Sequence, residues 1–249
     1  MLPLAYIAEL WRYPVKSMRG EQVDALEVQP DGIAHDRRYA FLSSGAPAGK
    51  PRLTGRERAA LLRYSASVSA NGTEIRTPEG RRFQVHDPAL LTYFEQHLPH
   101  GNRITLEHDP AAGPYTDVRP IAIVSTETLA ILNRTFGRAV DPRRFRSNLL
   151  ITFTSEANRE LTGGNPDLFP EDAVAGHTLQ LGATCRLRLL EKIPRCRVVT
   201  LDPDTVEPDP ALMKHLDRRY GGRLGIYAAV VTSGPVQTGD AVAMASTEV

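Results

Sequence analysis

Residues 61–77 read LLRYSASVSANGTEIRT, and this stretch indicates a β-hairpin. Asn71-Gly72 separates two short β-prone runs, and an Asn-Gly pair in that setting favours a tight turn between antiparallel strands. Similar runs, separated by turn signals such as Asp31-Gly32, occupy the first third of the chain. This spacing predicts a β-barrel or β-sandwich. The strands predicted in this third are Ala5 to Tyr13, Val23 to Val28, Arg38 to Leu42, Leu61 to Ser69, Thr73 to Thr77 and Arg82 to Val85.

The rest of the chain combines strands with a few helices, so the expected fold is mainly β. Ser125 is a suitable N-cap for a helix from about Thr126 to Phe136, which Gly137 can end in the left-handed conformation. The segment His108 to Pro120 contains Gly and Pro and is predicted to be a connector or the wall of a site. Further helices are expected at Ala89 to His97 and Ala211 to Tyr220, and strands at Asn148 to Phe153, Thr178 to Leu181, Arg186 to Lys192, Val198 to Leu201 and Ile226 to Val231.

The composition of the chain argues against several classes of protein. The 249 residues suit two closely packed domains, predicted at 1–100 and 101–249. The 30 Lys and Arg residues nearly balance 29 Asp and Glu residues, so no global field attracts a nucleic acid. Two cysteines without repeated spacing argue against a disulfide scaffold, and the start of the chain lacks the pattern of a signal peptide. No apolar run approaches the roughly 20 residues of a membrane span, so we expect a cytoplasmic protein.

The two cysteines have different surroundings. Cys196 lies between Arg195 and Arg197, and neighbouring cations favour the thiolate, which is both a nucleophile and a soft metal ligand. Cys185 alternates with apolar residues as in a strand, so we interpret it as a small buried hydrophobe. Cys196 is therefore the candidate for chemistry.

Several predicted turns carry cations beside small polar groups. They include Lys16-Ser17, Asp36-Arg37 and the run Arg143-Arg144-Phe145-Arg146 before Ser147-Asn148. Guanidinium groups bind phosphate in a bidentate manner and lysine adds a point charge, so together these turns would suit a small anionic cofactor. Taken singly, each such turn is more often solvent-exposed surface. His97, His100 and His108 lack a nearby cysteine pair, so a zinc site there is improbable.

Read together, these segments resemble the MOSC superfamily, in the branch that has an N-terminal β-barrel domain and includes the mitochondrial amidoxime reducing component and its bacterial relatives. The resemblance covers nearly the whole chain and keeps its motifs in order. It implies an N-terminal β-barrel domain packed on a MOSC β-barrel domain. The motifs are Tyr13-Pro14-Val15-Lys16-Ser17, Asp36-Arg37, Leu53-Thr54-Gly55-Arg56, Asp117 with Pro120, Ser125-x-x-Thr128-Leu129 with Leu132-Asn133, Arg144-Phe145-Arg146-x-Asn148, Glu171-Asp172, Arg195-Cys196 leading into Asp202-Pro203-Asp204-Thr205, and the closing segment 234–240.

The resemblance implies a molybdenum cofactor, in which the metal is bound by a pterin dithiolene and by one protein cysteine, here Cys196. Asp117 would lie near the open face of the metal and relay protons or orient water. At the level of the family, pyridoxal phosphate binding is also implied. The residues that would hold the pterin and its phosphate are Lys16, Ser17, Arg37, Arg146 and Asn148, with Arg56, Arg144 and Arg195 as weaker candidates.

The implied reaction is the two-electron reduction of N-hydroxylated or related N-oxygenated small molecules. Two cysteines cannot supply the four thiolates of an ordinary iron–sulfur cluster, and no flavin or nicotinamide fingerprint is present. A separate electron donor is therefore implied, such as a ferredoxin or a haem or flavin reductase. An alternative is a carrier in which Cys196 holds the cofactor or a persulfide; in a third reading, Cys196 is an ordinary thiol.

The chain departs from the family pattern in two places. Val118 and Arg119 follow Asp117 where amidoxime-reducing relatives carry small hydroxyl residues, which would change the pocket wall and with it the choice of substrate. Ser147 replaces the proline usual between the Arg and Asn of the pterin motif, a change that we expect to be tolerated.

Overall fold

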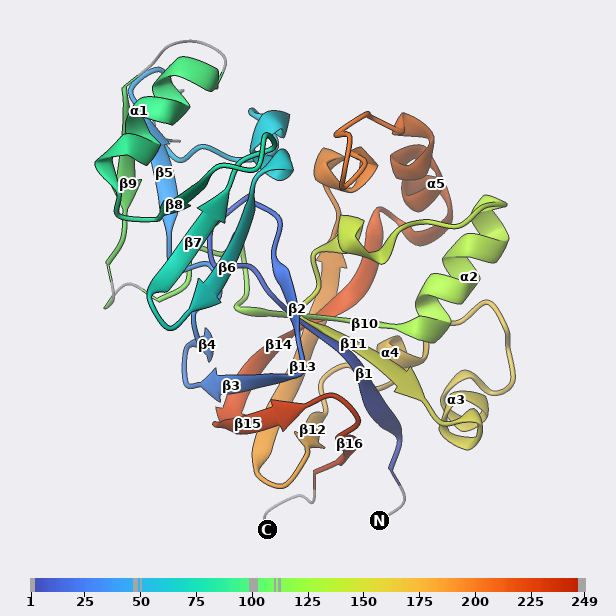
Figure 1. The fold of residues 1–249 in the computed structure, drawn as a ribbon. Coiled ribbons are helices and arrows are strands. Elements are labelled where there is room, and N and C mark those ends of the chain that lie inside the picture. The colour runs from blue at the N-terminus through green and yellow to red at the C-terminus, as the bar shows by residue number, and fades with distance from the viewer. Residues whose placement is uncertain are drawn as a thin grey trace.

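The computed structural model describes residues 3–46, 49, 51–98, 103–109, 111 and 113–245. A closed barrel of seven strands forms its larger part, in the order β11, β10, β14, β13, β12, β16 and β1, with β11 pairing back to β1 (Figure 1). The predicted mainly β fold with a barrel and a few helices is therefore confirmed. The bounds are β1 Ala5–Arg12, β10 Ile121–Ser125, β11 Leu149–Phe153, β12 Thr178–Leu181, β13 Cys185–Pro194, β14 Arg223–Thr232 and β16 Ala241–Met244.

Apolar side chains from several strands fill the interior of the barrel. In β1, Ala5, Ile7 and Leu10 are buried, and they pack in one cluster with Leu187 and Ile226 of β13 and β14. Ala5 and Ile7 follow the two-residue alternation of a strand, and a register shift between Ile7 and Glu9 precedes Leu10. Closure removes the exposed edges of the sheet. The strand β2 (Glu21–Val23) continues the sheet beside β1.

A second apolar layer covers one side of the barrel (Figure 1). The helices α2 (Thr126–Phe136) and α5 (Pro210–Tyr220) contribute Leu132 and Leu216 to a cluster that includes Phe145 and Val199. The expected bounds of α2 are confirmed: the Ser125 hydroxyl accepts a hydrogen bond from the Thr128 amide at 3.0 Å, and Gly137 ends the helix with φ 82°. Through Val199, this layer fixes the segment that follows Cys196.

A smaller lobe lies to the upper left in Figure 1. Its core contains Met18, Phe41, Ile75, Leu90 and Phe94. The predicted hairpin around residues 70–72 is present, with Ser69 paired to Gly72. The elements of this lobe are β5 Ala40–Ser43, β6 Ser65–Ser69, β7 Gly72–Arg76, β8 Arg82–Gln84, β9 Ile104–Glu107 and α1 Pro88–His97.

Strands from the two predicted domains, 1–100 and 101–249, pair with each other. The first strand, β1, belongs to the barrel and pairs with β11 and β16, while β3 (Ala25–Gln29) pairs with β15 (Gly234–Gln237) and β4 (Gly32–Ile33). Residues 3–33 therefore connect the smaller lobe to the barrel. The boundary between residues 100 and 101 stays a prediction, and residues 99–102 lie outside the described part.

Two predicted strands differ from the structure. Val198 to Leu201 lies in a 3₁₀-helix, Arg197–Thr200, because the carbonyl groups of Val199 and Thr200 accept hydrogen bonds from Arg144 instead of joining a ladder. The first residues of Leu61 to Ser69 belong to a 3₁₀-helix, Ala59–Arg63, that buries Leu61 and Leu62. Tertiary contacts override β-propensity in both places. Two helices had no sequence prediction, α3 Ser155–Thr162 and α4 Pro170–Ala173.

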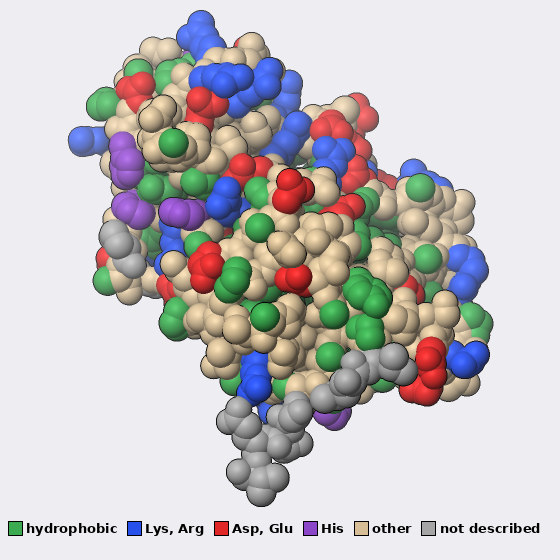
Figure 2. Space-filling model, turned by 60° about the horizontal axis from the view of Figure 1, so that its bottom comes forward, with side chains coloured by type: hydrophobic (Ala, Val, Ile, Leu, Met, Phe, Trp, Pro, Cys, Tyr) green, Lys and Arg blue, Asp and Glu red, His purple; other side chains and the backbone are tan. Residues whose placement is uncertain are grey.

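The described surface is mixed in charge. On the face shown in Figure 2, Lys and Arg side chains are interspersed with Asp and Glu, and hydrophobic side chains form small groups. None of the helices in the described ranges has the length and apolar character that a membrane span requires.

One carboxyl group is fully buried beneath this scaffold. Glu171 of α4 accepts hydrogen bonds at Oε2 from the hydroxyls of Ser125 and Thr128, both at 2.7 Å, while its Oε1 has no partner among the described residues. Burial raises the pKa of Glu171 above its usual range, and the two hydroxyl groups offset part of that rise.

We expect Glu171→Gln to change how stability depends on pH. A carboxyl whose pKa is raised by folding binds its proton more tightly in the native state, so the free energy of unfolding falls as pH rises above the unfolded value near 4.5. Urea unfolding at pH 5 and pH 7 should show a smaller loss of stability in the variant than in the wild type. An equal loss in both proteins would contradict the assignment.

Candidate functional site

A cleft between the smaller lobe and the barrel gathers the predicted site residues. Its empty volume is about 890 Å³, including space open to solvent. The smaller lobe contributes Thr54, Gly55 and Leu62, and the barrel contributes Ala122 and Tyr227. The structure places every residue predicted for the site in the lining of this cleft: Lys16, Ser17, Arg37, Arg56, Asp117, Arg144, Arg146, Asn148, Arg195 and Cys196.

Cys196 follows the end of β13 and begins the 3₁₀-helix Arg197–Thr200. Cys196 is partly exposed and lines the cleft, and both cysteines are free thiols. Cys185 lies fully buried in β13, where burial raises the pKa of its thiol to about 11, as expected for a structural cysteine. The one thiol that can reach a ligand is therefore Cys196.

Arg195 is held by the backbone beside that thiol. Its Nε donates to the Leu224 carbonyl at 2.8 Å and its Nη1 to the Phe145 carbonyl at 2.9 Å, whereas its buried Nη2 has no partner in the described structure. Burial lowers the pKa of Arg195 to about 10, with Tyr227 and Cys196 opposing that shift. The guanidinium therefore remains charged at neutral pH and favours an anion nearby.

A buried network fixes the base of the cleft. The Asp36 carboxylate accepts from the Tyr13 amide at 2.7 Å and the Asn148 side chain at 3.2 Å, and it pairs with Arg37. Arg37 and Arg146 each lie over the Tyr13 ring, 4.8 Å and 4.4 Å from its centroid. Burial, followed by the Arg37 charge, lowers the pKa of Arg146 to about 10, so both guanidinium groups stay cationic at neutral pH.

Backbone strain also gathers at this site. Among the described residues, five non-glycine residues have positive φ, and three of them line the cleft: Ser17 at 65°, Arg37 at 50° and Arg146 at 50°. A fourth, Val206 at 64°, lies in the loop after Cys196. Such conformations persist only where the surroundings enforce them, and they are enriched at ligand sites.

Asp117 lies at the mouth between two cations. Its Oδ1 accepts from the Lys16 ammonium at 2.5 Å and its Oδ2 from Arg56 at 3.0 Å. Burial alone would raise the pKa of Asp117, but Lys16, with Arg56 and Arg37, holds it below the usual range. Burial also lowers the pKa of Lys16, and the carboxylate opposes that shift. At neutral pH Asp117 is therefore an anion.

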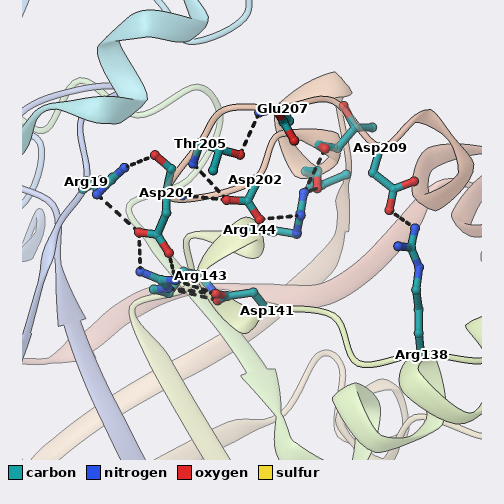
Figure 3. Close-up of polar contacts among 12 residues, drawn as sticks. Arg19, Arg138, Asp141, Arg143, Arg144, Asp202, Asp204, Thr205, Glu207 and Asp209 are labelled. Atoms are coloured by element: carbon teal, nitrogen blue, oxygen red, sulfur yellow. Dashed lines mark hydrogen bonds and ion pairs between the residues drawn. The ribbon is translucent and has the colours of Figure 1, made fainter. Parts of the chain in front are cut away.

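An ion-pair network fixes the loop that follows Cys196 (Figure 3). Arg19 donates one hydrogen bond from Nε to the Leu62 carbonyl at 2.8 Å and another from Nη2 to the Asp204 carbonyl at 2.7 Å. Arg143 donates to Asp204 Oδ2 at 2.7 Å, and Arg144 donates to the Thr200 carbonyl at 2.8 Å. Arg19 precedes the strands of the smaller lobe in the sequence, whereas Arg143 and Arg144 follow them. All three arginines hold the loop after Cys196.

Sequence reasoning missed some of the residues that complete the site. Tyr13 and Asp36 belong to the sequence motifs but were not predicted as site residues. They form the buried network that orients Arg37 and Asn148. Tyr227 of β14 lines the cleft, and only its place in an apolar strand was evident from the sequence. The sequence signal for Tyr227 was its polar hydroxyl group within an otherwise apolar strand.

His97 and His108 lie outside the described lining of the cleft. The His97 ring stacks on Tyr93 with centroids 3.9 Å apart, and the His108 ring stacks on Tyr39 at 4.4 Å. His100 lies outside the described residues. The packing of these two rings fits a structural role.

Family models match both parts of the chain in the order of this architecture. Residues 4–98 match the MOSC N-terminal beta barrel domain, and residues 111–243 match the MOSC domain. The chain belongs to the MOSC domain family. The resemblance noted from the sequence is therefore confirmed at the level of the family.

Known relatives of this MOSC chain are distant. It is 24% identical to mitochondrial amidoxime reducing component 2 from Bos taurus, over 80% of this chain and 67% of that protein. It is 25% identical to mitochondrial amidoxime-reducing component 1 from Homo sapiens, over 95% of this chain and 82% of that protein. The crystal structure of the YUAD protein from Bacillus subtilis has a TM-score of 0.50 at 19% identity, covering 96% of this chain and 93% of that one, which supports the fold alone.

We expect Val206→Gly to stabilise the loop after Cys196. A β-branched residue at φ 64° is strained by about 1–2 kcal/mol, and glycine removes that strain at a smaller entropic cost. Chemical denaturation should show a gain of about 0.5–1 kcal/mol in the free energy of unfolding. Val206→Ala is the matched control: it keeps the Cβ atom and should show no comparable gain. An equal gain in both variants would contradict this account.

We expect Asp204→Asn to loosen the Cys196 loop specifically. Asp167→Asn is the matched control, because its side chain is 55% exposed against 56% for Asp204 and it also pairs with two arginines, Arg134 and Arg219. Both variants should lose about 0.5–1 kcal/mol of stability. Only Asp204→Asn should raise the alkylation rate of Cys196, by a few-fold, together with hydrogen exchange across residues 197–207. Equal alkylation rates in the two variants would exclude the positioning role.

Proposed function

We propose that this protein is a molybdenum-cofactor-dependent oxidoreductase that reduces N-hydroxylated or related N-oxygenated small molecules. The observation that carries the proposal is the convergence of one accessible thiol and seven cationic side chains on a single cleft in a MOSC fold. The two curated relatives, whose names state amidoxime reduction, support the reaction class. The cations are Lys16, Arg37, Arg56, Arg119, Arg144, Arg146 and Arg195, and Asp117 is the one carboxylate in the described lining.

The residues present fit the chemistry of such a cofactor. A soft thiolate suits molybdenum that is already bound by sulfur, so Cys196 would be the protein ligand. Two buried guanidinium groups, those of Arg146 and Arg195, have few protein acceptors: Arg146 donates to the Met18 carbonyl at 2.6 Å, and Nη2 of Arg195 has no partner. An anionic pterin phosphate would satisfy charges of this kind.

The site residues have two roles in this proposal: some would bind the cofactor, and others would position neighbouring parts of the site. Lys16, Ser17, Arg37, Arg146 and Asn148 would hold the pterin and its phosphate. Arg144 donates to backbone carbonyls of the Cys196 loop and to Asp202 at 3.1 Å, so it would act mainly by positioning that loop. Arg195 is likewise bound to backbone carbonyls, and Arg56 pairs with Asp117 at the mouth.

The cofactor, when bound, would supply the two-electron reduction of the nitrogen–oxygen bond. The balance is one N-hydroxy group, two electrons and two protons giving the N–H compound and water. The Lys16 ammonium, whose pKa is lowered by burial, would donate one of the two protons and regain it from solvent, which would also supply the second. The Asp117 carboxylate, an anion at neutral pH, would orient that ammonium or a water molecule.

The electrons would come from a separate donor protein, either a ferredoxin or a haem or flavin reductase. No nucleic acid or membrane partner is proposed. A cytoplasmic location and family-level pyridoxal phosphate binding stay predictions.

Replacing Cys196 tests the assignment. The wild type from a cofactor-producing host should contain nearly one molybdenum per chain by elemental analysis, with pterin fluorescence after oxidation, and should reduce benzamidoxime with an artificial electron donor. Cys196→Ala should lose most of its molybdenum and at least about 100-fold in activity. Cys185→Ala is the control that should keep its metal, because that thiol is buried in the barrel.

Two results would overturn parts of this proposal. Absence of both metal and pterin from the wild type would exclude the cofactor. Stoichiometric cofactor that depends on Cys196 but supports no reduction, and that transfers to an acceptor protein, would favour the carrier function instead.

A further inference from the structure

Arg119 lies at the mouth of the cleft, two residues after Asp117. Its Nε donates to Glu191 Oε1 at 3.0 Å, and Nη1 and Nη2 have no partner among the described residues. The two side chains are 47% and 43% exposed. Arg119 nevertheless belongs to the lining of the cleft, so its free donors lie where a ligand must enter.

The neighbouring side chain adds an apolar surface. Val118 is 54% exposed, one of four large hydrophobic residues with substantial exposure in the described chain. An isolated exposed valine is ordinary. Val118 lies between Asp117 and Arg119 in the sequence but outside the described lining of the cleft, so the inference rests on Arg119.

The remaining cations of the cleft also have protein acceptors, and that of Arg146 is the Met18 carbonyl. Arg37 pairs with buried Asp36, Arg144 and Arg195 donate to backbone carbonyls, and Lys16 and Arg56 both pair with Asp117. Arg119 is paired only with the exposed carboxylate of Glu191, which lies outside the described lining of the cleft. An ion pair this exposed contributes little, so a ligand carboxylate can replace Glu191 without a large loss.

We propose that Arg119 determines substrate specificity by binding an anionic group, foremost a carboxylate, on the N-oxygenated substrate. This inference rests on the proposed function and narrows its substrate class to acidic N-oxygenated molecules. Glu191 competes with the substrate for the same guanidinium. A planar guanidinium with two free Nη groups suits bidentate recognition of a carboxylate.

A matched pair of compounds tests this inference. Benzamidoxime and 4-carboxybenzamidoxime differ by one carboxylate. Calorimetric dissociation constants, measured on the cofactor-loaded protein without an electron donor, should favour the carboxylated compound by about tenfold. Arg119→Gln should reduce that ratio to near one, and Arg119→Lys should keep part of it because the charge remains without the fork. Glu191→Gln should increase the ratio because it removes the competing carboxylate.

The outcomes separate this inference from the proposed function. Equal binding of both compounds by the wild type, or a ratio unchanged in Arg119→Gln, would overturn the role of Arg119 even if both compounds are reduced. A ratio that changes as expected while neither compound is reduced by an artificial donor would support the anion contact and contradict the reductase. A preference whose loss appears in KM but not in kcat would support binding as its cause.

Discussion

The buried carboxylate of Asp36 is the interaction on which the site depends. It is 1% exposed and joins three parts of the chain: the end of β1 through the Tyr13 amide, the turn through Arg37, and the start of β11 through Asn148. Removing one member of a buried charge pair commonly costs about 3–5 kcal/mol, because the other charge is left uncompensated. The geometry of the cleft base is therefore set by the requirement that this charge be satisfied.

That requirement explains why strain and charge occur together. Asp36 and the Tyr13 ring hold Arg37 and Arg146 close to each other, although two neighbouring guanidinium groups repel and both adopt left-handed backbone conformations. A bound anion would relieve the repulsion. Arg19, Arg143 and Arg144 hold the loop that follows Cys196 (Figure 3). Cys196 lines the same cleft as Arg37 and Arg146.

Much of the local structure followed from the sequence. Ser125 and Gly137 marked the ends of α2, the Asn71-Gly72 hairpin formed, and Cys185 is buried in β13. The prediction failed at Val198 to Leu201, where β-branched residues form a 3₁₀-helix because Arg144 binds their carbonyl groups from a distant segment. The same arginine was expected to contact the cofactor. Its donors are directed to the loop, which a single sequence could not reveal.

The sequence by itself determined the candidate residues and the β character of the chain, because turn chemistry, strand alternation and charge type are local properties. Only the tertiary structure decided that ten side chains separated by up to 180 positions, from Lys16 to Cys196, line one cleft. It also decided that β1 belongs to the barrel, that Asp117 is paired with Lys16, and that Arg119 keeps free donors at the mouth. These outcomes depend on long-range strand pairing and on which charges are buried, neither of which is encoded in any short stretch of residues.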